Sequence, residues 1–166
     1  MAGCHLKGAF MSIEWRDALC VGDPSIDSDH KHLIDLINQF EQSITGQINH
    51  KSVAKVLLGL VQYTTEHFTR EEEIQLKIRY PYVESHRRQH RDVLKKLGGL
   101  LQEYTESHGE IRDKMIRDMT DFLKEWLVNH IIESDLRMRP FVLKMQAEQK
   151  DAAKRRRLAA QLTEPH

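Results

Sequence analysis

The chain is poor in cysteine, lacks long apolar runs and has no excess of either charge. It contains 2 cysteines among 166 residues, and its 25 basic side chains balance 25 acidic ones. Two cysteines near the start do not form a disulfide framework, so reduced thiols are expected. No stretch approaches the roughly 18 uninterrupted apolar residues of a membrane-spanning helix. A net charge of zero provides no overall field that would favour a nucleic acid or a membrane surface.

The N-terminus also lacks the apolar run of a secretory signal, so the cytoplasm is the predicted compartment. The length suits one domain with a core of its own. The predicted organisation is an N-terminal extension over 1–12, a helical domain over 13–139 and a basic tail over 140–166. Met11 is a possible alternative start, because the sequence after it reads as the beginning of the fold.

What the sequence does contain is a strong helical period. Apolar residues recur every three or four positions over about 30–44, 53–78, 86–104 and 116–130, which predicts four helices. Short connectors make consecutive helices antiparallel neighbours. The predicted fold class is therefore all-α, an up-down-up-down antiparallel four-helix bundle.

Several local features refine this prediction. Asp27, Ser28 or Asp29 is expected to cap the first helix, and Pro140 is expected to close the fourth. Two adjacent glycines at 98–99 predict a kink or a close helix contact.

Beyond Pro140 the composition becomes basic, with six basic and two acidic residues from Lys144 to Arg157. No aromatic or base-reading motif accompanies these charges, so the tail is interpreted as a solvated helical or disordered extension, and no nucleic-acid partner is expected.

The chemistry of the chain lies in polar residues placed within or beside the apolar stripes. An unpaired buried ion costs several kcal/mol, so these side chains require a common partner. A metal centre in the bundle core is the simplest candidate. The candidate ligands are His30, His67, Glu71, His86, His90, His130 and Asp135.

Taken singly, these residues are ambiguous. His67 and Glu71 are four residues apart, as are His86 and His90, so each pair projects from one helical face and can chelate a metal. Each pair could equally be a set of surface polar groups. A lone histidine such as His130 is more often a satisfied core residue. Asp135 is rotated by about 140° from His130 on an ideal helix, and spacing alone favours an exposed charge there.

Taken together, they favour a metal centre, because every predicted helix contributes at least one candidate ligand. Imidazoles and carboxylates without thiolate suit iron, manganese or zinc. Seven ligands exceed what one ion takes from protein. Two ions bridged by Glu71 and Asp135 would use all seven and leave a position for a small molecule.

These residues stand in stretches that resemble the bacteriohemerythrins, the prokaryotic branch of the hemerythrin family. The matching stretches are 26–34, 67–72, Tyr80-Pro81 followed by two histidines, and 126–131 followed by Asp135. The resemblance implies two iron ions joined by an oxo or hydroxo bridge, with O2 as ligand and nitric oxide as a possible second one. It assigns His86, His90 and His130 to one iron, His30 and His67 to the other, and Glu71 and Asp135 to both.

The resemblance also implies an apolar O2 pocket, walled by Phe68, Trp126, Leu127 and Ile131. Three positions depart from the family pattern. Asp29 stands where glutamine is usual, Gln75 where methionine is usual, and Met138 where an aromatic residue is usual.

The favoured function is reversible O2 binding for storage, delivery or scavenging, without enzymatic activity. Three alternatives stay open: a sensor of O2, nitric oxide or redox state acting through a separate partner, a di-iron enzyme handling peroxide, nitric oxide or iron, and a metal-free helical interaction module. The absence of a fused signalling domain in the printed chain counts against a sensor.

Overall fold

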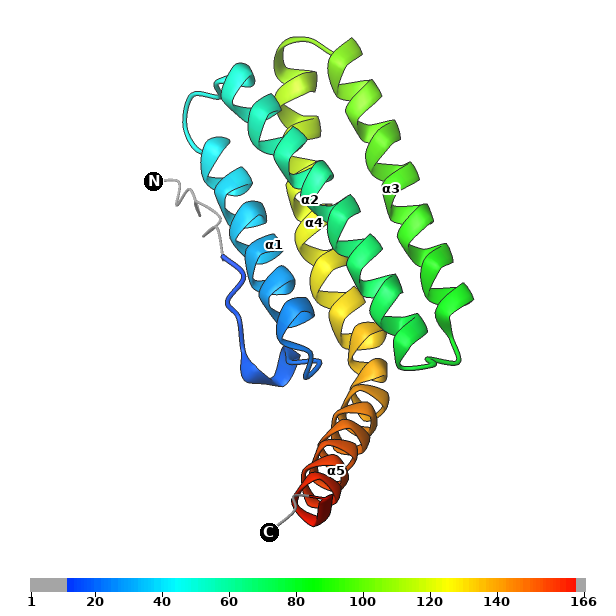
Figure 1. The fold of residues 1–166 in the computed structure, drawn as a ribbon. Coiled ribbons are helices and arrows are strands. Elements are labelled where there is room, and N and C mark those ends of the chain that lie inside the picture. The colour runs from blue at the N-terminus through cyan, green and yellow to red at the C-terminus, as the bar shows by residue number, and fades with distance from the viewer. Residues whose placement is uncertain (1–11, 164–166) are drawn as a thin grey trace, which may run out of the picture.

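A computed structural model describes residues 12–163, with side chains to residue 161. Its main elements are four long antiparallel helices (Figure 1). Helices α1 and α3 each pack against both α2 and α4. No strand occurs among the described residues. The predicted all-α, up-down-up-down bundle is therefore confirmed. The helices are α1 (Pro24–Ser43), α2 (His50–Lys77), α3 (Val83–Glu106) and α4 (Gly109–Glu133).

Helix α1 begins earlier than the apolar stripe predicts. Asp23 is its N-cap, and the carboxylate accepts hydrogen bonds from two backbone N–H groups of the first turn at 3.0 and 3.3 Å. Pro24 follows at the first helical position, where its missing N–H is not needed. The prediction of a cap at Asp27, Ser28 or Asp29 is thus wrong. Asp27 instead accepts hydrogen bonds from two N–H groups of the preceding loop at 2.7 and 3.1 Å.

The end of α4 also differs from the prediction. The helix stops at Glu133, a 3-10 turn η2 (Asp135–Met138) follows, and Pro140 lies in the first turn of a fifth helix, α5 (Arg139–Thr163). Pro140 therefore opens a helix and does not close one, because a proline is tolerated where first-turn N–H groups have no helical partner.

The glycine pair in α3 has no special contact. A methyl group added at Gly98 or Gly99 would meet nothing within 4 Å, and α3 continues through both. The close helix contact predicted there is absent.

The bundle interior has three layers along the helix axes. A large apolar cluster, the upper core, lies toward the α1–α2 and α3–α4 loops. A smaller cluster, the lower core, lies toward α5. On α1 and α2 the predicted metal ligands fall between residues of these two clusters. The upper core includes Ile37, Phe40, Leu57, Leu60, Leu97, Ile116, Met119 and Leu123, and the lower core is Val21, Ile26, Ile78, Tyr80, Met138 and Val142.

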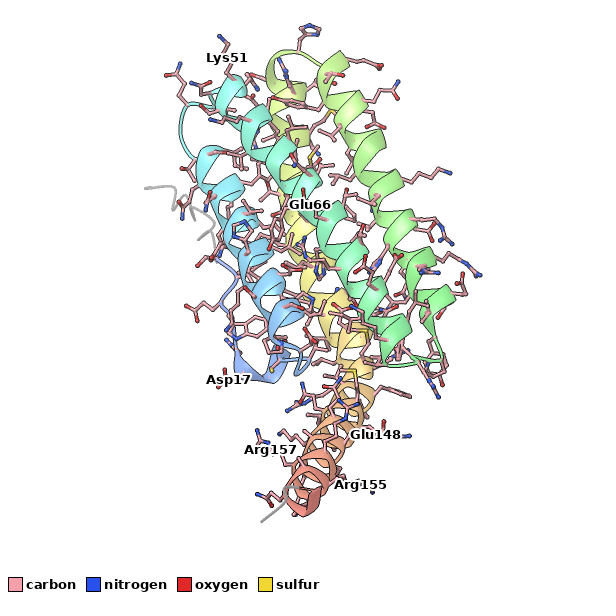
Figure 2. The ribbon with its side chains drawn as sticks, in the orientation of Figure 1. Asp17, Lys51, Glu66, Glu148, Arg155 and Arg157 are labelled. Carbon is pink, nitrogen blue, oxygen red and sulfur yellow. The ribbon has the colours of Figure 1, made fainter. Side chains whose placement is uncertain are left out.

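Helix α5 leaves the bundle after its first turns (Figure 1). Val142 is buried in the lower core, and the Gln146 side chain donates a hydrogen bond to the Gly22 carbonyl at 2.8 Å. Every side chain over 147–161 is exposed. Glu148, Arg155 and Arg157 extend into open space in Figure 2. The described part of the tail is helical.

Other predictions touch the ends of the chain. The extension over 1–12 falls outside the described residues except for its last residue, and so does Cys4. Cys20 is a free thiol, as expected. None of the helices in the described range is long and apolar enough to cross a membrane.

Candidate metal centre

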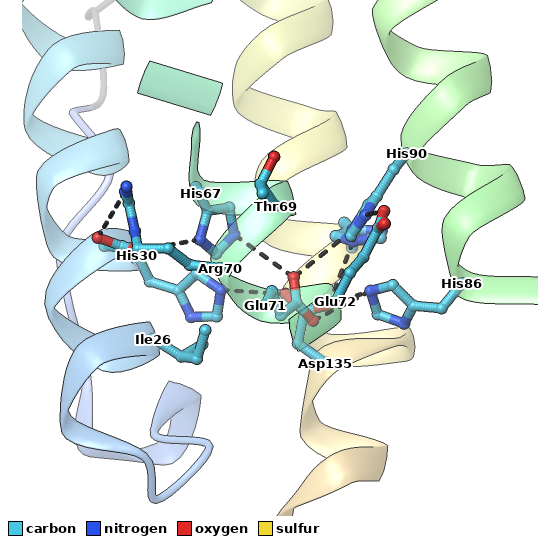
Figure 3. A network of polar contacts seen from close by, with 12 residues as sticks. Ile26, His30, His67, Thr69, Arg70, Glu71, Glu72, His86, His90 and Asp135 are labelled. Atoms are coloured by element: carbon cyan, nitrogen blue, oxygen red, sulfur yellow. Dashed lines mark hydrogen bonds and ion pairs between the residues drawn. The ribbon is translucent and has the colours of Figure 1, made fainter. Parts of the chain in front are cut away.

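All seven predicted ligand residues are buried together between the upper and lower cores. The most exposed of them is His130, at 6% of its surface, and Glu71 and Asp135 are completely buried. They come from α1, α2, α3, α4 and η2. In Figure 3, Glu71 and Asp135 lie between His30 and His67 on one side and His86 and His90 on the other. We call this set of seven residues the polar layer.

One half of the polar layer gathers three histidines around the two carboxylates. His86 Nε2 lies 3.1 Å from Glu71 Oε1 and 3.2 Å from Asp135 Oδ1. His130 Nε2 lies 3.2 Å from the same Asp135 oxygen and 3.2 Å from His90 Nε2. One ligand atom from each of Glu71, His86, His90 and His130 can be chosen so that all four lie within 4.8 Å of one another. Such a cluster can surround a single cation.

The other half holds two histidines against the second oxygens of the same carboxylates. His30 Nε2 lies 3.2 Å from Asp135 Oδ2, and His67 Nε2 lies 3.5 Å from Glu71 Oε2. The two rings are 5.0 Å apart between centroids. Asp135 thus presents one oxygen to each half, and so does Glu71, although its Oε2 is also 3.5 Å from His90 Nε2. Both carboxylates are placed to bridge two cations.

The placement of Asp135 follows from the break after α4. On a continued α-helix this side chain would point about 140° away from His130. Ser134 leaves ideal helical geometry, with φ −119° and ψ −59°, and the chain tightens into the 3-10 turn that begins at Asp135. The turn directs the carboxylate inward, so the exposed charge that spacing alone favours is wrong.

The donor atoms of the polar layer fit a metal centre. His30 Nε2, His86 Nε2, Glu71 Oε2 and both Asp135 oxygens are buried without a hydrogen-bond partner of acceptable geometry, although they lie near one another. A buried polar atom left unsatisfied costs about 1–3 kcal/mol, so five in one layer are expensive. Cations bound among them would satisfy all five atoms at once.

Without a metal, protons must hold this layer together. Burial lowers the pKa of His86, but the carboxylates of Asp135 and Glu71 outweigh that effect and raise it to about 9. Burial and the Glu71 charge raise the pKa of Asp135, yet His130 and His30 help to bring it down to about 2. Burial lowers the pKa of His130 to about 4. The layer therefore holds ionised carboxylates next to a protonated His86. A metal bound there would displace the His86 proton.

Two of the histidines are oriented by further carboxylates. His67 Nδ1 lies 3.3 Å from Asp29 Oδ2, and His90 Nδ1 lies 2.9 Å from Glu72 Oε1. An ionised carboxylate can only accept, so each Nδ1 must carry the proton, and in the neutral ring Nε2 keeps its lone pair. Sequence reasoning missed Glu72, because its pairing with α3 depends on how the two helices pack.

Two of the four residues predicted to wall an O2 pocket pack on histidines of the polar layer, and the other two belong to the upper core. Phe68 stacks on His90 with ring centroids 3.7 Å apart, and Trp126 stacks on His130 at 4.7 Å. Trp126 and Leu127 line an apolar cavity of about 10 Å³. Ile131 is fully buried in the upper core.

Trp126 has a second environment. It also lines an outer groove of about 410 Å³ that includes His130, Phe122 and Lys96. Because the same side chain borders the groove and the internal cavity, Trp126 lies between them.

A four-helix bundle with histidines and carboxylates in one buried layer is typical of the class of non-haem metal-binding bundle proteins. The family model described as the hemerythrin HHE cation binding domain matches residues 21–142. The chain belongs to the hemerythrin family. The hemerythrin domain binds a di-iron centre, and the His/Glu cluster of this chain is suited to holding it.

Individual relatives agree with this assignment. A bacteriohemerythrin of Stenotrophomonas maltophilia is 31% identical over 121 residues, 73% of this chain and 75% of the relative. A hemerythrin-like protein of Naegleria gruberi is 30% identical over 123 residues, 74% of this chain and 87% of the relative. The crystal structure of a wild-type hemerythrin, 24% identical, covers 78% of this chain and 97% of that one with a TM-score of 0.68, which supports the fold.

Proposed function

We propose that this chain binds O2 reversibly at a di-iron centre, for storage, delivery or scavenging. The observation that carries the proposal is the pair of buried carboxylates, Glu71 and Asp135, each with one oxygen toward either group of histidines. Family membership supports iron as the metal and O2 as the ligand.

The ligands divide unequally between the two proposed ions. His86, His90 and His130 would hold one iron, and His30 and His67 would hold the other. The second iron would have one protein ligand fewer, which would leave a position for a small molecule. When bound, the two irons supply the electrons that O2 takes up and later returns.

The chain's own residues favour binding over turnover. Five imidazoles and two carboxylates make a less anionic site than the carboxylate-rich di-iron proteins, whose motif pairs glutamate with a histidine three residues later. Phe68, Trp126 and Leu127 limit the access of water and protons to the layer. We therefore infer an O2-binding protein that is not an enzyme, and a cytoplasmic location remains a prediction.

The visible absorption spectrum of the iron-loaded protein tests this function. The protein is reduced without air, exposed to O2 and then flushed with inert gas. A charge-transfer band that appears with O2 and disappears on flushing is expected. If protein shown to hold two irons gave no band, the O2-binding function would be excluded.

A sensor of O2, nitric oxide or redox state is the second candidate. It is favoured by α5, whose side chains over 147–158 are exposed and could contact a separate protein. A band that decays at once to the ferric form would support this role. Repeated turnover of peroxide, nitric oxide or iron with a reductant would instead indicate an enzyme.

A further inference from the structure

Asp29 connects the metal-facing His67 to a set of hydrogen bonds that reaches the protein surface. Its carboxylate accepts from Tyr63 Oη at 2.7 Å, from Arg70 Nε at 2.8 Å and from Arg70 Nη2 at 3.1 Å. His67 Nδ1 lies 3.3 Å from the same carboxylate. Asp29 is buried, with 6% of its surface exposed, whereas the Arg70 side chain is 39% exposed. The guanidinium thus covers the outer side of a buried anion.

The corresponding arrangement at His90 is more exposed to solvent, although its distance between histidine and carboxylate is shorter, at 2.9 Å. Its partner Glu72 has a side chain that is 25% exposed, and the nearby Arg87 approaches through a single nitrogen at 3.1 Å. Arg87 also contacts the exposed Glu84. Solvent screens Glu72 more than Asp29, so Asp29 is the carboxylate whose effect on its histidine depends more on fixed protein partners.

The Asp29 carboxylate remains ionised in this environment. Arg70 donates to both oxygens of this carboxylate and Tyr63 donates to one of them, a set of donors that matches an ionised acceptor. Burial and the hydrogen bond to Asp29 raise the pKa of Tyr63 to about 12, so the phenol keeps the proton that it donates. Asp29 is therefore a fixed negative charge against the back of the His67 ring.

We propose that Asp29 is a positioning residue that fixes the tautomer of His67 and increases its electron-donating strength, and that Arg70 and Tyr63 moderate this effect. The inference rests on the proposed function in one respect, since it takes His67 as an iron ligand. A carboxylate that accepts the Nδ1 proton makes the imidazole a more basic ligand. A more basic ligand favours ferric over ferrous iron and lowers the reduction potential. Arg70 partly neutralises the negative charge of Asp29, so it should raise the reduction potential.

Two substitutions should consequently shift the reduction potential with opposite signs. Asp29→Asn keeps the shape of the side chain but removes its charge, so the potential should rise. Arg70→Gln removes the moderating cation, so the potential should fall. A shift of about tenfold in the ferric-to-ferrous ratio, which is about 59 mV for a one-electron couple, is expected for Asp29→Asn. The matched control is Asp118→Asn, the same chemical change in an exposed pair with Lys114.

The measurement is an anaerobic potentiometric titration of each iron-loaded variant, with iron content determined on the same samples. General loosening of the site would move both variants in the same direction, whereas charge tuning moves them apart. Shifts of equal sign, or no shift in either variant, would overturn the proposal.

Zinc-loaded protein provides a second readout that needs neither iron nor O2. NMR of this diamagnetic form should show a hydrogen-bonded Nδ1 proton on His67 that is protected from exchange, and the protection should be lost in Asp29→Asn. An unchanged Nδ1 proton in that variant would also overturn the proposal. The absence of an O2-dependent band in wild-type protein would remove the proposed function, yet the zinc experiment would still decide the role of Asp29.

Discussion

The upper core and the polar layer are built on the same helices but contribute to the protein in opposite ways. In α2, Leu57 and Leu60 pack in the upper core, and His67 and Glu71 continue the same stripe into the polar layer. The backbone is one helix throughout, so only side-chain chemistry distinguishes the two regions. The upper core buries apolar surface, which stabilises the fold. The polar layer leaves buried atoms unpaired, which costs stability until a cation binds.

This difference implies that folding and metal binding are largely separable. The apolar cores on either side can hold the helices in register before a metal binds to the polar layer. Substitutions in the two regions should therefore have different consequences, and the following experiments test that separation.

The largest effect is expected from Glu71→Ala in the polar layer. It removes a bridging carboxylate, so the protein should no longer hold two irons, while its far-ultraviolet circular dichroism stays helical. Iron analysis after reconstitution measures the loss. Glu73→Ala, at an exposed position on the same helix, is the control and should retain both irons. Full iron content in Glu71→Ala would remove this residue from the ligand set.

The converse change is Leu57→Ala in the upper core. Because Leu57 is 1% exposed, its truncation leaves a cavity and should lower the free energy of unfolding by about 2–5 kcal/mol. The neighbouring Leu58 is 69% exposed, so Leu58→Ala should change it by no more than about 0.5 kcal/mol. Urea unfolding measures both. A loss of iron stoichiometry in folded Leu57→Ala would show that the two regions are not separable.

The pH dependence of the metal-free protein tests how protons replace the metal. The pKa of His86 rises from 6.5 to about 9 on folding, so the folded state binds more protons between these values. Stability from this group is complete below pH 6.5 and is lost as the pH rises through 9, by up to ~3 kcal/mol.

Urea midpoints of the metal-free protein across that range should therefore fall as the pH rises. The zinc-loaded protein should lack this decline, because the metal has displaced the proton. His130 acts in the opposite sense at lower pH, since its pKa of about 4 makes stability fall as the pH drops below 6.5. A constant midpoint between pH 6.5 and 9 in metal-free protein would contradict the assignment of the proton to His86.

A smaller effect is expected where the upper core meets the polar layer. Leu127 is 2% exposed and lines the apolar cavity, so Leu127→Asn introduces a polar group that attracts water. Irreversible release of the bound O2 as peroxide, which would leave the irons ferric, should accelerate by about tenfold, or ~1.4 kcal/mol in the barrier. The decay of the O2-dependent band measures the rate, and Leu127→Met is the apolar control. Equal rates in the two variants would remove Leu127 from the protective wall.

The sequence was sufficient to predict the helices and most of the polar layer, because both depend on periodicity. His67 with Glu71 and His86 with His90 stand four residues apart, a spacing that a helix converts directly into a shared face. The same reasoning misplaced Asp135, because a single break at Ser134 changes the direction of the side chain and periodicity carries no signal for it.

Features that depend on helix packing or on local capping could not be predicted from the sequence pattern. Asp23 was overlooked as the cap of α1 because it precedes the apolar stripe. The pairing of Glu72 with His90 requires α2 and α3 to be placed side by side. The helical state of α5 was undecided, because its composition suits a solvated helix as well as a disordered tail.

The contact between His30 and Asp135 bears on the order of events in folding. Their side chains lie 3.2 Å apart, although the two residues are 105 positions apart in the sequence. Closing so long a loop is entropically costly, and local helical contacts form faster. The complete site therefore exists only after the first and last helices of the bundle have docked, and metal capture becomes a late step that cannot template the first helices. Refolding of the bundle, followed by stopped-flow circular dichroism, should accordingly proceed at the same rate with and without ferrous iron in the buffer.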